Sequence, residues 1–196
     1  MTSTSTFRIP RAELTGPAGR LVAALSRRLW GEVPDNAHVL FHHRRVMWSL
    51  FGLERRVGRW DRLDPHLKTY GVMAAAGAIG CTWCLDFGYY MAREDGLDLA
   101  KVREVPRWRE SGAFTPLERD VMEYAEAMTA TPPTVTDEMS GRLREQIGTE
   151  ALVELTVMVA VENLRSRVNS AAGLASQGFS EVCELPLAAP STAVGP

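Results

Sequence analysis

Apolar residues recur every three or four positions along most of this chain, which is the spacing of one face of an α-helix. Six stretches carry such a stripe: residues 21–29, 39–50, 67–74, 117–128, 139–147 and 152–163. A further helix is expected to begin around Cys81 and to end near Gly96. No segment shows the sustained alternation of apolar and polar residues that predicts a strand or a hairpin. The pattern therefore predicts an all-α fold of about seven or eight helices.

Polar residues, prolines and glycines mark the expected ends of several helices. Asp64 stands directly before a proline and has the form of an N-cap followed by a first-turn proline. Thr115 and Glu118 have the spacing of a capping box. Gly148 is expected to end one helix before the long last helix begins, and Gly173 is expected to end that one.

One folded domain is expected, because 196 residues suffice for a single sizeable core. We place the helical domain at residues 16–184. Residues 1–15 are expected to form a flexible N-terminal segment and residues 185–196, rich in proline, a poorly ordered tail.

Charge and hydropathy limit the classes of partner. The formal net charge is −2, which does not indicate binding to nucleic acid or to an anionic membrane surface. No run of about 18 apolar residues predicts a transmembrane helix, and the N-terminal residues lack the apolar region of a secretory signal. A cytoplasmic location is the resulting expectation.

The strongest chemical signal is the pair Cys81 and Cys84, three residues apart at an expected helix start. The helix dipole and the free N–H groups there favour a thiolate. One sulfur of such a pair can attack an oxidised substrate, and the other can then close an intramolecular disulfide. The alternative interpretation is two small core residues, because free cysteine is often buried.

A metal site is not predicted. Zinc needs two further ligands at matching spacing, whereas Cys183 stands alone near the C-terminus and the histidines all lie upstream. His38 and His42 are one helical turn apart, but no third ligand accompanies them. We therefore expect no metal and no bound cofactor.

Two segments resemble a known family. Residues 80–88 (GCTWCLDFG) follow an Ala-rich helix, and residues 162–169 (ENLRSRVN) lie in the last helix. This arrangement, over about residues 35–185, resembles the carboxymuconolactone decarboxylase and alkylhydroperoxidase AhpD-like superfamily. The resemblance implies an all-helical fold and a homo-oligomer: a dimer, trimer or hexamer.

In the hydroperoxidase branch that this chain resembles, the second cysteine attacks the peroxide and the first resolves it. The resemblance therefore implies Cys84 as the attacking thiol, Cys81 as its partner, a redox-active disulfide and an external dithiol as electron donor. The motif of that branch places a histidine four residues after the second cysteine, where this chain has Gly88. It also places a glutamate upstream, where this chain has Lys68 and Thr69.

Other side chains could supply the missing proton transfer or line a pocket. Asp86 lies in the first turn, where it suits the helix dipole better than proton transfer. Tyr89 could donate a hydrogen bond from its phenol. Glu162, Asn163 and Arg167 could form a buried polar network, or alternatively a structural salt bridge between helices or subunits.

Trp83 could shield the sulfurs or line an apolar pocket, or it could be an ordinary core or interface residue.

Three functions remain open at this point. The principal hypothesis is a thiol-dependent reductase of hydroperoxides, which could be weak without the usual proton relay. The second is a lyase, isomerase or divergent biosynthetic enzyme resembling the lactone decarboxylase, which would work without thiols. The third is a non-catalytic, redox-sensing or structural oligomer.

Overall fold

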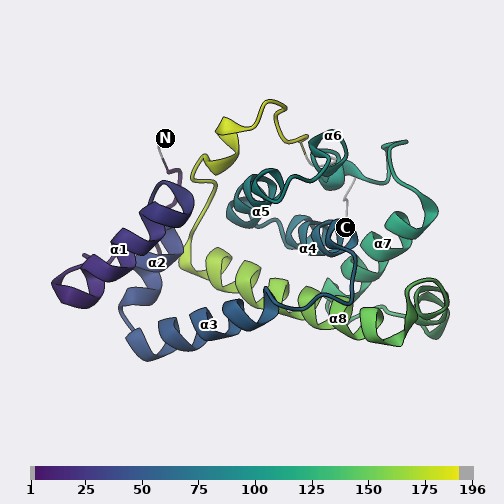
Figure 1. The fold of residues 1–196 in the computed structure, drawn as a ribbon, viewed down its shortest axis with the longest axis horizontal. Helices are drawn as coiled ribbons and strands as arrows, with labels where there is room; N and C mark the ends of the chain where they lie inside the picture. The colour runs from purple at the N-terminus through teal and green to yellow at the C-terminus, as the bar shows by residue number, and fades with distance from the viewer. Residues whose placement is uncertain (1–2, 190–196) are drawn as a thin grey trace.

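The computed structural model describes residues 3–189, and their secondary structure is helical throughout (Figure 1). The α-helices are α1 (Gly16–Trp30), α2 (Asp35–Phe41), α3 (Arg44–Val57), α4 (Pro65–Ile79), α5 (Thr82–Glu94), α6 (Leu99–Val102), α7 (Pro116–Thr129) and α8 (Asp137–Ala172). Two 3-10 turns, η1 (Val105–Arg107) and η2 (Phe179–Val182), complete the described chain. The all-α class and the expected number of helices are confirmed for these residues.

Helix α4 lies at the centre of the molecule, against α5, α7 and α8 (Figure 1). It is apolar around most of its circumference, which is typical of a fully buried helix. Gly71 lies at the closest approach: a Cβ added there would be 2.9 Å from Leu155 Cδ1 of α8 and 3.4 Å from Val121 Cγ1 of α7. The missing side chain therefore lets three helices meet closely.

The expected helix ends are present. The Asp64 side chain accepts hydrogen bonds from the first backbone N–H groups of α4, and Thr115 and Glu118 form a capping box at the start of α7. Gly148 has φ 80° and ψ 165°, which interrupts α8 and divides it into the two helical parts that the sequence predicts.

The stripe at 39–50 does not belong to one helix. The chain turns at His42 and His43, so that α2 ends at Phe41 and α3 begins at Arg44. His43 has a non-helical backbone, and its Nδ1 accepts from Val46 N at 3.3 Å. The apolar spacing continues across the break, so that periodicity alone does not reveal the turn.

Residues 3–15, the described part of the N-terminal segment, make specific contacts with the helical domain. Thr6 N donates to Gly173 O at 2.8 Å, at the end of α8. The His38 ring lies 2.9 Å from Ala12 O and the His42 ring 2.7 Å from Pro10 O. These two histidines hold the N-terminal segment. Residues 1–2 and, of the expected tail, 190–196 lie outside the described residues.

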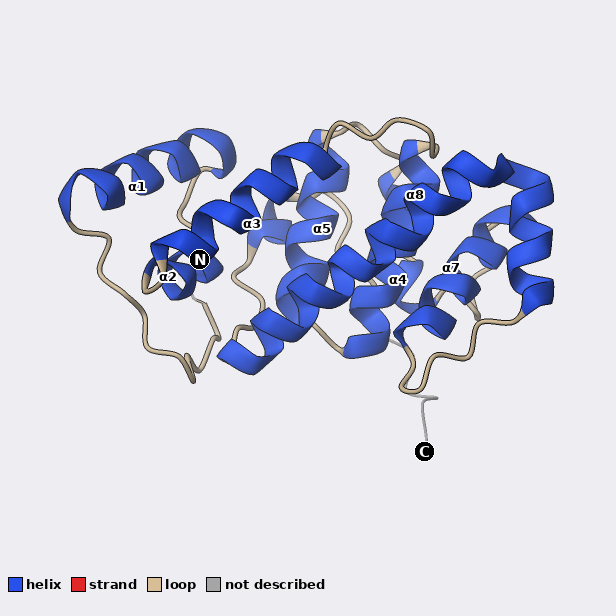
Figure 2. Cartoon of the chain, turned by 90° about the horizontal axis from the view of Figure 1, so that it is seen from below, coloured by secondary structure: helices blue, strands red, loops and turns tan. Residues whose placement is uncertain are grey.

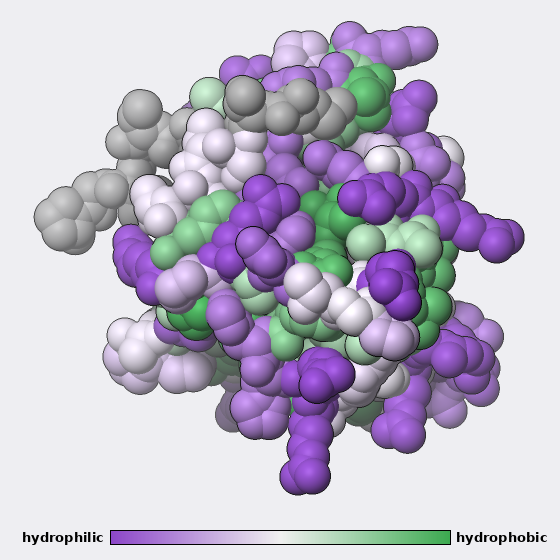
Figure 3. All heavy atoms as spheres, turned by 90° about the vertical axis from the view of Figure 1, so that its left-hand side faces the viewer, coloured by the Kyte–Doolittle hydropathy of each residue, from purple (hydrophilic) through white to green (hydrophobic). Residues whose placement is uncertain are grey.

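The end of the molecule that carries α1 and α2 is mostly hydrophilic, with apolar atoms showing between the polar side chains (Figure 3). On α1, Leu21 and Leu29 are 58% and 50% exposed. Within the described residues, no helix has the length and apolar character needed to cross a membrane.

The C-terminal end of α3 reaches the middle of α8 (Figure 2). Val57 packs with Met158 and Val161 there, and Glu54 and Arg165 form a two-point ion pair, with N–O distances of 2.6 and 2.9 Å. This contact matters for the site, because Arg165 also bonds to a buried carboxylate of α8.

We predict that Gly71→Val destabilises the fold by about 1–3 kcal/mol, because its side chain would overpack the contact with Leu155 and Val121. Gly77→Val is the matched control on the same helix, since a Cβ there meets nothing within 4 Å. Urea unfolding of both variants measures the difference. Equal stabilities would contradict the close packing at Gly71.

Candidate functional site

The cysteine pair lies at the sharp junction between α4 and α5. Gly80, with φ 78°, ends α4 in the left-handed conformation that favours glycine, and Cys81 is the N-cap of α5. Cys81 and Cys84 form a disulfide. Cys81 is 1% exposed and Cys84 8% exposed, so that Cys84 is the more accessible sulfur.

A polar face of α8 lies against this disulfide. Ser166 Oγ is 3.3 Å and Asn169 Nδ2 3.4 Å from Cys84 Sγ. Ser166 Oγ also lies 2.6 Å from Glu162 Oε1. Glu162, Ser166 and Asn169 are all buried and are spaced i, i+4 and i+7, so that they share one face of α8. The Ser166 hydroxyl thus lies within hydrogen-bond distance of both Cys84 Sγ and a buried carboxylate.

Burial dominates the electrostatics of this carboxylate and raises the pKa of Glu162 to about 7. Arg165 Nη1, 3.3 Å from Glu162 Oε2, and the Ser166 hydroxyl both oppose the shift. Arg165 is itself bound more closely by Glu54. Glu162 can therefore gain or lose a proton near neutral pH.

Asp86 binds the chain that follows α8. Its two carboxylate oxygens accept hydrogen bonds from the backbone N–H groups of residues 177–180, at 2.8–3.1 Å, and from the Ser180 hydroxyl at 2.6 Å. Asp86 is 3% exposed. This arrangement gives the carboxylate the role of a clamp between α5 and the C-terminal segment.

Trp83 and Tyr89 also face this C-terminal segment. The Trp83 ring stacks on Phe87, with ring centroids 5.1 Å apart, and its Nε1 lies 3.5 Å from Gln177 Oε1. Tyr89 is fully buried and donates to Leu185 O at 2.8 Å, and burial raises the pKa of its phenol. Both side chains are thus engaged in packing.

Asn163 and Arg167 lie on a different face of α8 from Glu162. Asn163 Nδ2 donates to Thr129 Oγ1 at 2.9 Å, and Arg167 Nη2 donates to Thr129 O at 3.4 Å, at the end of α7. The structure therefore separates these two residues from Glu162, whose partners are Arg165 and Ser166. Our sequence interpretation did not single out Ser166 or Asn169, although their spacing from Glu162 within a buried helix was available as a signal.

The positions at which the chain departs from the hydroperoxidase motif pack against neighbouring side chains. Gly88 lies against Met73, whose Cγ would be 3.5 Å from an added Cβ. Lys68 Nζ is 2.5 Å from Glu154 Oε1, and the other oxygen of Glu154 accepts from Arg62 N and Leu63 N. Lys68 and Glu154 thus pair α4 with α8.

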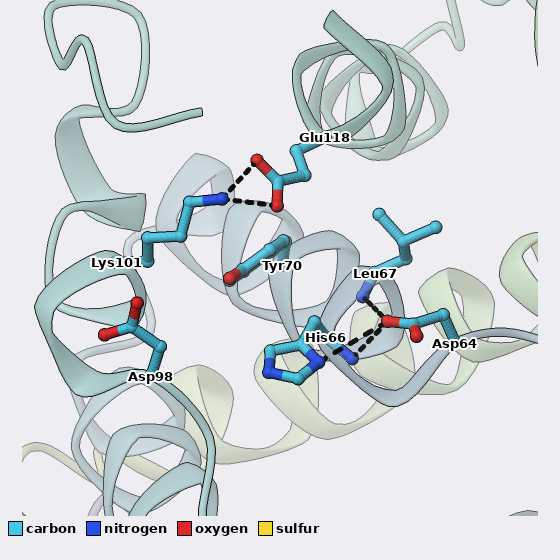
Figure 4. Close-up of a pocket in the computed structure, with 7 residues that line it drawn as sticks. All are labelled: Asp64, His66, Leu67, Tyr70, Asp98, Lys101 and Glu118. Atoms are coloured by element: carbon cyan, nitrogen blue, oxygen red, sulfur yellow. Dashed lines mark hydrogen bonds and ion pairs between the residues drawn. The ribbon is translucent and has the colours of Figure 1, made fainter. Parts of the chain in front are cut away.

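The pocket drawn in Figure 4 lies at the opposite end of α4 from the disulfide. It has a volume of about 310 Å³ and is lined by Asp64, His66, Leu67, Tyr70, Asp98, Lys101 and Glu118. Tyr70 and Cys81 are eleven residues apart, or about 16 Å along a helix axis. Lys101 binds both oxygens of Glu118, at 2.6 and 2.8 Å, and burial raises the pKa of Tyr70 to about 12.

A larger cavity of about 700 Å³ lies beside α1, lined by residues that include Arg11, Arg27 and Gln177. Neither Cys81 nor Cys84 lines either cavity. In the described part of the chain, no three His, Cys, Asp or Glu side chains gather as metal ligands.

We predict that Asp86→Asn destabilises the protein by about 2–5 kcal/mol, because the amide cannot accept all the N–H groups of residues 177–180. Asp98→Asn is the control: Asp98 is an exposed N-cap, and asparagine caps equally well. Thermal unfolding measures both effects. A loss no larger than that of the control would contradict the clamp.

Glu162 should impose a pH dependence on stability. Its pKa is about 7 in the fold against 4.5 ordinarily, so that between these values the folded protein retains a proton that the unfolded chain has lost. The unfolding free energy of the oxidised protein should therefore fall as the pH rises from about 4.5 to about 7. Glu162→Gln should abolish this fall, whereas Glu154→Gln should retain it. Urea unfolding across this range measures the slope, and an unchanged slope in Glu162→Gln would refute the assignment.

Comparison with known proteins gives relatives in sequence and in fold. The Carboxymuconolactone decarboxylase family model matches residues 44–127. The uncharacterized protein YnjA of Escherichia coli (strain K12) is 33% identical over 159 residues, which cover 81% of this chain and 81% of YnjA.

Solved structures share the fold at lower identity. The debrominase Bmp8, in a cysteine-to-alanine variant with 2,3,4-tribromopyrrole, is similar with a TM-score of 0.77 and 18% identity, over 92% of this chain and 96% of Bmp8. An uncharacterized peroxidase-related protein from Ralstonia eutropha JMP134, with an alkylhydroperoxidase AhpD core, has a TM-score of 0.75 and 17% identity, over 95% and 100% of the two chains. The family match and the identity to YnjA establish that the chain belongs to the carboxymuconolactone decarboxylase family.

Proposed function

We propose that this protein is a thiol-dependent hydroperoxide reductase in which Cys84 attacks the peroxide and Cys81 resolves the product. The observation that carries the proposal is the Cys81–Cys84 disulfide at the start of α5, with two hydrogen-bond donors of α8 directed at Cys84 Sγ. The family membership supports it. No bound cofactor is required.

The reaction oxidises two thiols to a disulfide and reduces one hydroperoxide to an alcohol and water. The Cys84 thiolate attacks one oxygen of the hydroperoxide, the O–O bond breaks, and a sulfenic acid and an alcohol result. The Cys81 thiol then loses its proton and attacks the sulfur of the sulfenic acid; the S–O bond breaks, the disulfide forms, and the displaced hydroxide takes up that proton and leaves as water. An external dithiol of the cell reduces the disulfide and is itself oxidised.

The surroundings of the sulfurs favour this order of attack. Asn169 and Ser166 can donate to a thiolate at Cys84, and hydrogen bonds to the charged form lower a thiol pKa. Cys81, the N-cap, is almost completely covered, so that a peroxide reaches Cys84 more readily than Cys81. Cys84 is therefore the better nucleophile of the two.

A competing lyase reaction would need a cation for a carboxylate substrate. Arg165 is occupied by Glu54 and Glu162, and Arg167 bonds to Thr129, which makes this function the less supported one. Assembly into a homo-oligomer remains a prediction.

We predict that Cys84→Ser abolishes hydroperoxide consumption by the dithiol-reduced protein. Cys81→Ser should consume one equivalent and leave a sulfenic acid at Cys84, which a dimedone-type trap and mass spectrometry would locate. Cys183→Ser is the control and should retain turnover, because burial raises the pKa of the Cys183 thiol and makes it a poor nucleophile.

Full turnover in Cys84→Ser would overturn the proposal. Turnover of a carboxylated lactone that survives alkylation of both cysteines would instead favour the lyase. A disulfide that no dithiol of cellular potential reduces would favour a non-catalytic role.

A further inference from the structure

We propose that Glu162 and Ser166 form a proton relay for Cys84, taking the place of the histidine that Gly88 replaces. The inference deepens the proposed function and rests on it for the peroxide step alone. The proton exchange between Glu162 and Cys84 is a property of the reduced site, whatever its substrate.

The geometry supplies an unbroken path. Ser166 Oγ lies 2.6 Å from Glu162 Oε1 and 3.3 Å from Cys84 Sγ, and all three side chains are buried. A hydroxyl has one proton and two lone pairs, so that it can donate in only one direction at a time. When Glu162 is ionised, Ser166 donates to it and can accept from the Cys84 thiol. When Glu162 is protonated, Ser166 accepts from it and donates to the Cys84 thiolate.

These two arrangements differ by one proton, which is transferred between Cys84 and Glu162 through the Ser166 hydroxyl. The pair passes from a thiol and a carboxylate to a thiolate and a carboxylic acid, with one negative charge in each state. Creating a new charge in a buried site is costly, whereas moving an existing charge between two buried groups avoids most of that cost. The relay therefore suits a site that water reaches poorly.

The groups around the relay prepare Glu162 to accept a proton. Burial raises the pKa of Glu162 to about 7, so that this carboxylate is a stronger base than an exposed glutamate. Asn169 stabilises the thiolate through its 3.4 Å hydrogen bond. The charged groups that face Glu162 are Arg165 of its own helix, which favours the carboxylate, and Glu54 of α3, which opposes it.

The relay also returns the proton. When the thiolate attacks and the O–O bond breaks, the leaving alkoxide needs one proton to become the alcohol. Protonated Glu162 supplies this proton through the Ser166 hydroxyl and is again a carboxylate. One thiol proton thus passes to the alcohol, and no external acid is consumed.

The test uses the full chain with Cys84 as its single thiol, obtained by Cys81→Ser and Cys183→Ser. The ultraviolet absorbance of the thiolate is followed against pH in this parent and in three variants: Glu162→Gln, Ser166→Ala and Glu154→Gln. The last is the matched control, because Glu154 is also a buried carboxylate of α8 but pairs with Lys68.

We expect the thiolate of the parent to appear in two steps, because two coupled groups share the first proton lost. Glu162→Gln should reduce this to one step, whereas Glu154→Gln should keep both. Ser166→Ala leaves the Glu162 carboxylate in place and should keep two steps in the titration. It removes the hydroxyl that links Glu162 to Cys84. Circular dichroism establishes that each variant is folded. A single step in the parent, unchanged by Glu162→Gln, would overturn the inference.

The second readout is the rate of sulfenic acid formation with hydroperoxide across pH. A relay that needs Glu162 protonated and Cys84 ionised gives a bell-shaped profile in the parent. Glu162→Gln and Ser166→Ala should each lower the maximal rate by about 10²- to 10⁴-fold and should lose the alkaline fall. Bell-shaped profiles of equal height in all variants would refute the relay. A two-step titration in a protein that reacts with no hydroperoxide would uphold the proton exchange and refute the proposed function.

Discussion

The close approach of α4 to α7 and α8 fixes where the disulfide lies. Gly71 removes the side chain that would hold α8 away, and Gly80 then turns the chain directly from α4 into α5. The first turn of α5 is thereby placed against the buried face of α8. A change in the distance between α4 and α8 would move Cys84 relative to Ser166, whose hydrogen bond tolerates only a few tenths of an ångström. The packing of small residues is therefore a condition for the chemistry of the sulfur.

The clamp at Asp86 fixes the same turn of α5 from its other side. Its carboxylate collects the N–H groups of residues 177–180, and the segment that it holds carries Gln177, which lies against Trp83. Buried carboxylates are costly unless such donors surround them, so that Asp86 ties the two segments firmly. The cysteine pair thus lies between a rigid polar clamp and the polar face of α8, and neither contact depends on a bound group.

Features that depend on residues close together in the sequence could be predicted from the sequence. The capping box of Thr115 and Glu118 and the placement of Cys81 at a helix start depend on residues within one turn of each other. The break at His42 was missed because the apolar spacing runs through it. Ser166 was missed for another reason: it lies 82 residues from Cys84, and only the packing of α5 on α8 determines which turn of the long helix meets the sulfur. The role of Asp86 is likewise hidden in the sequence, because its partners lie more than 90 residues away.

The ability of Glu162 to accept a proton depends on how the hydrogen bonds of Arg165 are shared between Glu54 and Glu162. An arginine bound fully to a buried carboxylate would keep that carboxylate ionised and lower its pKa. Here Glu54 takes two bonds, at 2.6 and 2.9 Å, and leaves Glu162 one at 3.3 Å. The charge of Arg165 is mostly balanced by the partly exposed Glu54, so that burial governs Glu162 and raises its pKa. A surface residue of α3 therefore keeps a buried residue of α8 near its point of titration, although neither touches the sulfur.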